Sequence, residues 1–297
     1  MNKLSTYLIS FFISVLLVFA CIASVAALIA DINITQDKAY ELIRNNQINE
    51  KVHAELNDVF SERYYSSRIP ANVYMDNISA DYIEKCIEDR IDSAFDSLEG
   101  TVPLDASVPE NSELESDIRK YFEDFADSEG YEKDEKFEKK VENTISDAYK
   151  IIGSHCDVFK VSALNEHKVF SKLSGIYKKR NIMAGGALIS CFLLIALLII
   201  VNMKKRVTAM YWTGISALIS GAAGTILSVI ILNSKYYDSF SIKQPGVFTA
   251  YTQSMYKLTE AFLAASIAVA VIGISLLVIY TIVCDKNKHQ YVKPTEL

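Results

Sequence analysis

Four long stretches of this chain contain no Asp, Glu, Lys, Arg or His. They are Leu4–Ala30, Asn181–Met203, Val207–Ser234 and Ala261–Cys284. Proton-coupled carriers and ion pumps generally carry ionisable side chains within the membrane, and an intramembrane metalloprotease needs histidine and glutamate ligands. The missing charges therefore argue against these classes of membrane protein.

Signature motifs of common enzymes are absent as well. The chain has no GxxxxGK[ST], HExxH or GxSxG sequence and no CxxC pair. The sequence therefore does not support a phosphate-binding loop, a zinc protease, a nucleophile elbow or a paired-cysteine zinc site. We expect no catalytic residue, no metal ligand and no bound cofactor, and we expect that the protein is not an enzyme.

Two weaker patterns partly resemble metal-binding sites. His155-Cys156 with His167 matches no zinc spacing, and adjacent ligands rarely face one ion. Asp127–Glu138 has acidic residues at both ends of an EF-hand frame, but Glu132 stands where that loop requires glycine. A solvated helix face is the better interpretation of these acidic residues.

Cysteine is scarce, with five residues in 297. Cys21, Cys191 and Cys284 lie in the charge-free stretches, where a thiol behaves as a small apolar group. Cys86 and Cys156 share the polar region, and the sequence leaves open whether they pair, because two cysteines make no framework.

Charge is concentrated between the first and second apolar stretches. Residues 31–180 hold 32 acidic and 20 basic residues, a net of −12, whereas the whole chain has a net charge of −6. An acidic surface repels phosphate, so we expect no nucleic-acid partner.

Each charge-free stretch exceeds the roughly 20 residues that a helix needs to cross the hydrocarbon core. The chain therefore predicts an all-α, multi-pass membrane protein with the lipid bilayer as its first partner. Four transmembrane helices are expected at 4–30, 181–203, 207–234 and 258–284, with a domain at 31–180, an outer loop at 235–257 and a tail at 285–297.

Basic residues in short loops mark the cytoplasmic side. With the N-terminus inside, seven Lys/Arg fall on inner segments and three on the outer loop. Lys178-Lys179-Arg180 opposes this bias, but long domains translocate largely regardless of charge. We expect a cell-membrane protein with cytoplasmic termini and with residues 31–180 extracytoplasmic.

The first stretch also has features of a cleaved signal peptide, with Lys3 before it and Ser24-Val25-Ala26 as a small-x-small site. A signal core usually has 7–15 apolar residues, and this stretch is much longer. A retained anchor is the better interpretation.

Residues 31–180 show apolar residues at helical spacing, without a sustained alternating segment that would indicate a strand. Helices are predicted at Thr35–Arg44, Gln47–Ser66, Ala80–Glu99, Glu113–Ala126, Glu132–Ile152 and Asn165–Arg180, the last of which could run on into the second span. Pro70, Pro103 and Pro109 fall between these runs. An all-helical bundle of five or six helices follows.

The third and fourth apolar stretches are rich in small residues. Ser216, Ser220, Gly224 and Ser228 recur every four positions, which favours close helix packing in lipid over a pore lining. Aromatic residues in the predicted outer loop, including Tyr251 and Tyr256, are typical of an interfacial belt.

The order of parts, together with Ile34-Thr35-Gln36-Asp37-Lys38-Ala39-Tyr40 and Tyr211-Trp212-Thr213-Gly214-Ile215-Ser216, resembles uncharacterised four-span membrane proteins of Gram-positive, clostridia-like bacteria. The resemblance covers nearly the whole chain in layout. It implies the same anchor, acidic helical ectodomain and three-span unit, and it brings no activity with it.

These features predict a non-enzymatic envelope protein whose helical ectodomain binds an envelope protein partner or senses a condition outside the cell. The alternative is a permease-like subunit of an ABC-type transporter, which shares the order of one span, a large outer domain and three spans. That alternative fits less well, because Lys204-Lys205-Arg206 between the second and third spans are too few for a coupling helix. The oligomeric state stays open.

Overall fold

The computed structural model describes residues 3–105, 107–167 and 169–290, with side chains described between residues 4 and 286 of these ranges. Within these ranges the chain is helical and contains no strand, which confirms the all-α prediction. The chain forms two compact units. The membrane unit holds residues 3–34, 179–239 and 255–290, and the acidic unit holds residues 35–178 and 240–254.

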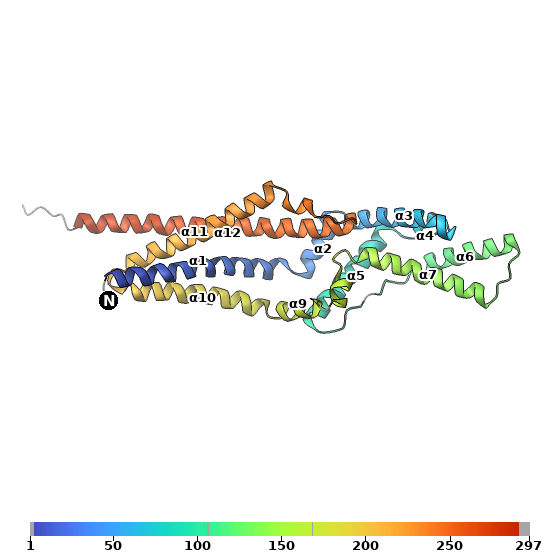
Figure 1. The fold of residues 1–297 in the computed structure, drawn as a ribbon, viewed down its shortest axis with the longest axis horizontal. Coiled ribbons are helices and arrows are strands. Elements are labelled where there is room, and N and C mark those ends of the chain that lie inside the picture. Colours follow the sequence, from blue (N-terminus) through green and yellow to red (C-terminus); the bar gives the residue numbers. More distant parts are fainter. Residues whose placement is uncertain (1–2, 106, 168, 291–297) are drawn as a thin grey trace, which may run out of the picture. The chain divides into compact units, whose positions relative to one another are not determined.

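Four helices are long and apolar enough to cross a bilayer: α1 (Lys3–Asn33), α10 (Arg180–Val201), α11 (Arg206–Asn233) and α12 (Pro245–Gln290). Short 3-10 turns, η1 (Met203–Lys205) and η2 (Tyr236–Ser239), follow α10 and α11. In the membrane unit α1 lies alongside α10, as Figure 1 shows, and also contacts α11. The chain is a multi-pass membrane protein.

Small hydroxyl residues of α1 hold this helix against its neighbours. The Asn202 side-chain amide donates to the Ser10 hydroxyl at 2.9 Å, and the Ser14 and Ser216 hydroxyls lie 2.6 Å apart. All four side chains are buried. Hydrogen bonds of this kind fix helix register in lipid, where apolar burial gives no preference between helix and lipid neighbours.

Glycines bring α11 and α12 into backbone contact. A Cβ on Gly273 would lie 2.5 Å from the Leu218 amide nitrogen and 2.8 Å from the Gly214 carbonyl oxygen. A Cβ on Gly221 would lie 2.6 Å from the Ser266 carbonyl oxygen. The small-residue stripe of the third span is therefore a packing surface, as the sequence predicted.

The acidic unit contains α2 (Gln36–Asn45), α3 (Ile48–Ser67), α4 (Ala71–Met75), α5 (Ala80–Glu99), α6 (Ser112–Glu129), α7 (Glu135–Cys156), α8 (Val161–Glu166) and α9 (Val169–Tyr177). Five of these agree closely with the ranges predicted from apolar spacing. The short helices α4 and α8 were not predicted; α4 lies in the segment around Pro70.

Local chemistry sets where these helices begin and end. The side chains of Thr35, Ser79, Asn111 and Asp134 each accept a hydrogen bond from the backbone at a helix start, as capping residues do. Gly100 and Gly130 end α5 and α6 in the left-handed conformation, with φ near 73° and 71°. Both positions favour glycine because other residues are strained there.

The core of the acidic unit is built from one face of each long helix. Its fully buried side chains include Ile43, Val52, Leu56, Ile83, Ile87, Leu114, Ile118, Val141 and Ile152. Their spacing along the chain is the periodic stripe seen in the sequence. Burial of these stripes against one another is the main stabilising term of this unit.

The first turns of α12 belong to the acidic unit and not to a loop. The prediction of an outer loop at 235–257 is wrong from Pro245 onward, because the helix begins there and continues without interruption to Gln290. Proline at the first helical position is a helix-start signal, which the loop prediction overlooked. The domain predicted at 31–180 accordingly gains residues 240–254.

Contacts within the acidic unit show how closely this segment packs. The Gly246 amide donates to Glu55 at 2.5 Å, and Lys51 Nζ donates to the Thr249 hydroxyl at 2.9 Å. Ala250 has no exposed surface. The Tyr251 hydroxyl, expected in an interfacial belt, instead donates to the Phe159 carbonyl oxygen at 2.7 Å.

Two other boundaries differ from the predicted ones. The helix expected to run from Asn165 into the second span is broken, since α9 ends at Tyr177 and α10 begins at Arg180. The first residues of the predicted tail at 285–297 continue α12, and residues 291–297 lie outside the described ranges.

We predict that Gly273→Ala destabilises the membrane unit, because the added methyl group has no space between α11 and α12. Overpacking of this kind costs about 1–3 kcal/mol, so the thermal midpoint of the full-length protein in detergent should fall by several degrees. Gly186→Ala in α10 is the matched control, since a Cβ there meets nothing within 4 Å. Equal midpoints for the two variants would contradict the close α11–α12 contact.

Candidate functional site

A groove on the acidic unit lies between α6, α7 and the segment before α6. We call it the α6–α7 groove. It has a volume of about 610 Å³ and is lined by Ser107, Val108, Glu115, Arg119, Glu142, Ile145, Ser146, Tyr149 and Lys150. Pockets that bind small molecules or peptide side chains usually have volumes of roughly 300–1,000 Å³. The groove is therefore large enough for such a ligand.

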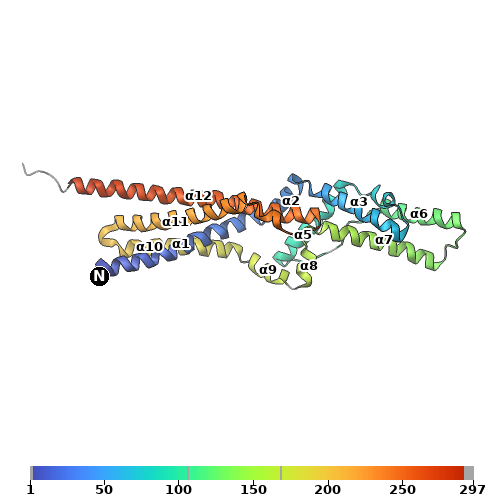
Figure 2. The same ribbon diagram turned by 45° about the horizontal axis from the view of Figure 1, so that its top comes forward.

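Helix geometry places these side chains together. Glu115 and Arg119 are four residues apart on α6, and the α7 residues recur at intervals of three or four from Glu142 to Lys150. Residues with this spacing share one face of a helix. The turn at 130–134 connects α6 to α7, so that the two helices form the hairpin seen in Figure 2.

Tyr149 organises the polar side of the groove. Its hydroxyl accepts a hydrogen bond from the Asn111 amide at 2.7 Å and donates to Glu115 Oε1 at 2.8 Å. Burial, together with the nearby Glu115 carboxylate, raises the pKa of Tyr149 to about 12. The phenol therefore stays protonated and donates to Glu115 at physiological pH.

The rim of the groove carries charges of both signs. Arg119 pairs with Glu138 at 2.6 Å, and Lys150 lies 3.4 Å from Asp147. Hydrogen bonding to Glu138 is the main reason that the pKa of Arg119 is raised. Val108 and Ile145 lie against the apolar core. Such a surface offers donors, acceptors and an apolar floor, which suits a peptide-like ligand better than a bare ion.

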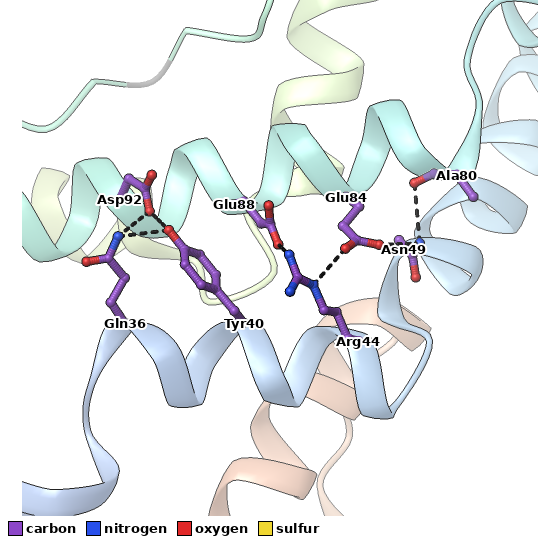
Figure 3. A network of polar contacts seen from close by, with 8 residues as sticks. All are labelled: Gln36, Tyr40, Arg44, Asn49, Ala80, Glu84, Glu88 and Asp92. Carbon is purple, nitrogen blue, oxygen red and sulfur yellow. Dashed lines mark hydrogen bonds and ion pairs between the residues drawn. The ribbon is translucent and has the colours of Figure 1, made fainter.

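A second polar feature joins α2 to α5 and is drawn in Figure 3; we call it the α2–α5 ladder. The Gln36 side-chain amide donates to Asp92 at 2.6 Å, and the Tyr40 hydroxyl donates to the same carboxylate. Arg44 bridges Glu84 at 2.9 Å and Glu88 at 2.5 Å. The ladder holds α2, the first helix of the acidic unit, against α5.

The ladder was missed at the level of sequence, although its spacing could have revealed it. Gln36, Tyr40 and Arg44 recur every four residues, as do the acidic residues 84, 88 and 92. Two helices with matching four-residue polar rows can pair in antiparallel order. Only the structure shows that these two rows face each other.

The structure places the three candidate metal ligands in different surroundings. His155 Nδ1 lies 2.9 Å from the Ile151 carbonyl oxygen one turn earlier, Cys156 is buried in the core, and His167 follows the last turn of α8. Among the described residues, no group of three His, Cys, Asp or Glu side chains is arranged to hold a metal ion.

The acidic segment weighed as an EF-hand loop is divided between two helices. Asp127 lies in α6 and pairs with Lys133 at 2.8 Å, whereas Glu138 lies in α7 and pairs with Arg119. The two ends of the frame therefore belong to separate ion pairs and do not surround one position.

Comparisons with known proteins add no relative. No protein-family model matches the chain, and neither a curated protein nor a solved structure matches it.

We predict that Tyr40→Phe destabilises the acidic unit by removing a hydrogen bond to a partly buried carboxylate. Bonds to charged groups contribute roughly 1.5–3 kcal/mol, so urea unfolding of the full-length protein should shift to lower denaturant. Tyr65→Phe is the matched control because that side chain is 81% exposed, and it should change stability by less than about 0.5 kcal/mol. A Tyr40→Phe protein as stable as this control would contradict the role of the ladder.

Proposed function

We propose that this protein is a non-enzymatic membrane protein whose acidic unit, outside the cell membrane, binds a peptide-like segment of an envelope partner. We further propose that the bound state reaches the membrane unit through α12. The observation that carries this proposal is that α12 is one helix with residues in both units, with the division at Ser254 and Met255.

A continuous helix is a suitable element for such coupling. Bending it would break backbone hydrogen bonds, so a displacement of its first turns is passed along its axis more readily than through a flexible linker. Gly246 and Ala250 fix these first turns in the acidic unit, where a Cβ on Gly246 would lie 2.6 Å from Val52 Cγ2. A shift of α3 against α12 would therefore move the helix.

The placement of the acidic unit outside the cell rests on the distribution of basic residues. Seven Lys/Arg fall on the proposed inner segments and three, Lys235, Lys243 and Lys257, on the proposed outer side, which follows the rule for cytoplasmic loops. The net charge of −12 over residues 31–180 also disfavours contact with anionic lipid surfaces. Both features support the placement of the acidic unit outside the cell membrane.

The α6–α7 groove supports a peptide-like partner. Its rim presents Arg119 and Lys150 beside Glu115 and Glu142, so that it can meet both charges of a polypeptide segment, and the Ser146 hydroxyl adds a neutral donor. Binding at a rim of this kind depends on electrostatic complementarity, which mainly sets specificity and the rate of association.

The test is site-specific photo-crosslinking in intact cells. A photoreactive amino acid at Ser146 should give a discrete adduct with an envelope protein, whereas the same group at Glu62, exposed on α3, should not. Arg119→Ala with Lys150→Ala should lower the adduct yield roughly tenfold, as expected when rim charges are lost. Lys85→Ala with Lys172→Ala, which changes the net charge equally at exposed positions, should leave the yield unchanged.

Three further results would distinguish the alternatives. An impermeant maleimide should label Ser66→Cys but not Lys205→Cys in intact cells, and the reverse pattern would refute the outside placement. Equal labelling of bulk membrane neighbours from Ser146 and Glu62 would refute partner binding at the groove. Stable co-purification with an ATPase would favour the permease-like alternative.

A further inference from the structure

Two cysteines from distant parts of the chain meet in the core of the acidic unit. Cys86 lies in α5 and Cys156 is the last residue of α7, and both belong to the same buried cluster. Their side chains are 4% and 1% exposed. Each thiol is the largest single influence on the pKa of the other. The helices α5 and α7 also pack against each other, so a modest approach of these two side chains would bring them into disulfide geometry.

We infer that Cys86 and Cys156 form a redox-convertible pair, which exists as two thiols in the described structure and as a disulfide joining α5 to α7 after oxidation. The inference depends on the packing of these two helices and not on the proposed partner or on which side of the membrane the unit lies. It assigns a modification to two side chains that the charge and motif analysis left unexplained.

The surroundings make the two sulfurs chemically unequal. The neighbouring Cys156 thiol is the main reason that the pKa of Cys86 is lowered. The Cys86 thiol, together with burial, raises the pKa of Cys156. Because the thiolate is the attacking form, Cys86 is the sulfur that reacts first.

The oxidation is a thiol–disulfide exchange with a small-molecule or protein disulfide as the oxidant. Cys86 thiolate attacks one sulfur of that disulfide and expels the other as a thiolate, leaving a mixed disulfide on Cys86. Cys156 then gives its proton to the departing thiolate and attacks the Cys86 sulfur. The products are one protein disulfide and two reduced thiols, so two electrons pass from the protein to the oxidant.

Burial determines when this reaction can occur. An oxidant cannot reach sulfurs that are 4% and 1% exposed, so exchange requires either opening of the last turn of α7 or oxidation before the core closes. Cys156 is at the end of its helix, and Asp157 follows with backbone angles outside the helical region. Helix ends open more readily than helix centres.

The closed loop would contain the whole α6–α7 groove, because every lining residue lies between Cys86 and Cys156. A disulfide at this position would tie both ends of the groove-bearing segment to one point in the core. Cross-linking a long loop stabilises the folded state mainly by restricting the unfolded chain. Oxidation should therefore make the α6–α7 segment more resistant to unfolding without changing its fold.

The test uses the full-length protein in detergent with oxidised glutathione as the oxidant. One sample stays in buffer and another contains urea just below the unfolding midpoint, so that slow access is not mistaken for lack of reaction. Free thiols are then blocked in denaturant and the protein is mapped by mass spectrometry. We expect a peptide linked through Cys86 and Cys156, formed faster in urea.

Stability provides the second measurement. The oxidised protein should resist proteolysis of residues 86–156 up to a temperature about 5–10 °C higher than the protein reduced with dithiothreitol. Cys86→Ser should remove both the linked peptide and this difference, and Cys156→Ala serves if the serine variant folds poorly. Cys191→Ser controls for thiols of the membrane unit and should leave both results unchanged.

Either of two outcomes would overturn the inference. In the first, Cys86 and Cys156 remain fully alkylatable after oxidation in both samples. In the second, each sulfur links only to another cysteine of the chain or retains glutathione.

Discussion

The burial of the first turns of α12 in the acidic unit is the interaction on which the proposed function depends. This segment meets α3 through Gly246, whose amide donates to Glu55 and whose missing side chain leaves room for Val52. The unpaired amides at a helix start need acceptors, and a carboxylate there also interacts favourably with the helix dipole. The same helix supplies the last membrane span. Because α12 starts within a folded core, movement of that core would also move the helix.

The two units are stabilised by different physical means, and this difference follows from their solvents. In the acidic unit, water drives apolar stripes such as Leu56, Ile87 and Ile118 together. In the membrane unit lipid offers an equally apolar surface, so contact depends on close backbone approach at glycines and on hydroxyl pairs such as Ser14 with Ser216. The most damaging substitutions therefore differ between the two units: loss of apolar volume weakens the core of the acidic unit, whereas an added side chain at a glycine separates the membrane helices.

Most of the fold could be predicted from the sequence, because apolar periodicity and charge-free length are local properties. The range of α5 was predicted to the residue, and the small-residue stripe of α11 was correctly assigned to packing. The start of α12 was not predicted, because Lys243, Gln244 and Pro245 are typical of a loop. The burial of Ala250 depends on residues almost 200 positions away in the sequence. The α6–α7 groove and the shared burial of Cys86 and Cys156 in one cluster also arise from tertiary packing. Spacing shows which residues share a helix face, but not which faces meet.

Hydrogen exchange of the full-length protein, read by mass spectrometry, tests the central claim most directly. The account predicts that the amides of Val247–Thr252 exchange as slowly as those around Val52 in α3, because both lie in one core, whereas residues 240–244 exchange rapidly. Replacement of Gly246 by valine should abolish the protection of Val247–Thr252 while leaving the membrane part of α12 protected. Fast exchange of Val247–Thr252 in the unmodified protein, at the rate of residues 240–244, would contradict the account, because that segment would then be the outer loop that the sequence first indicated.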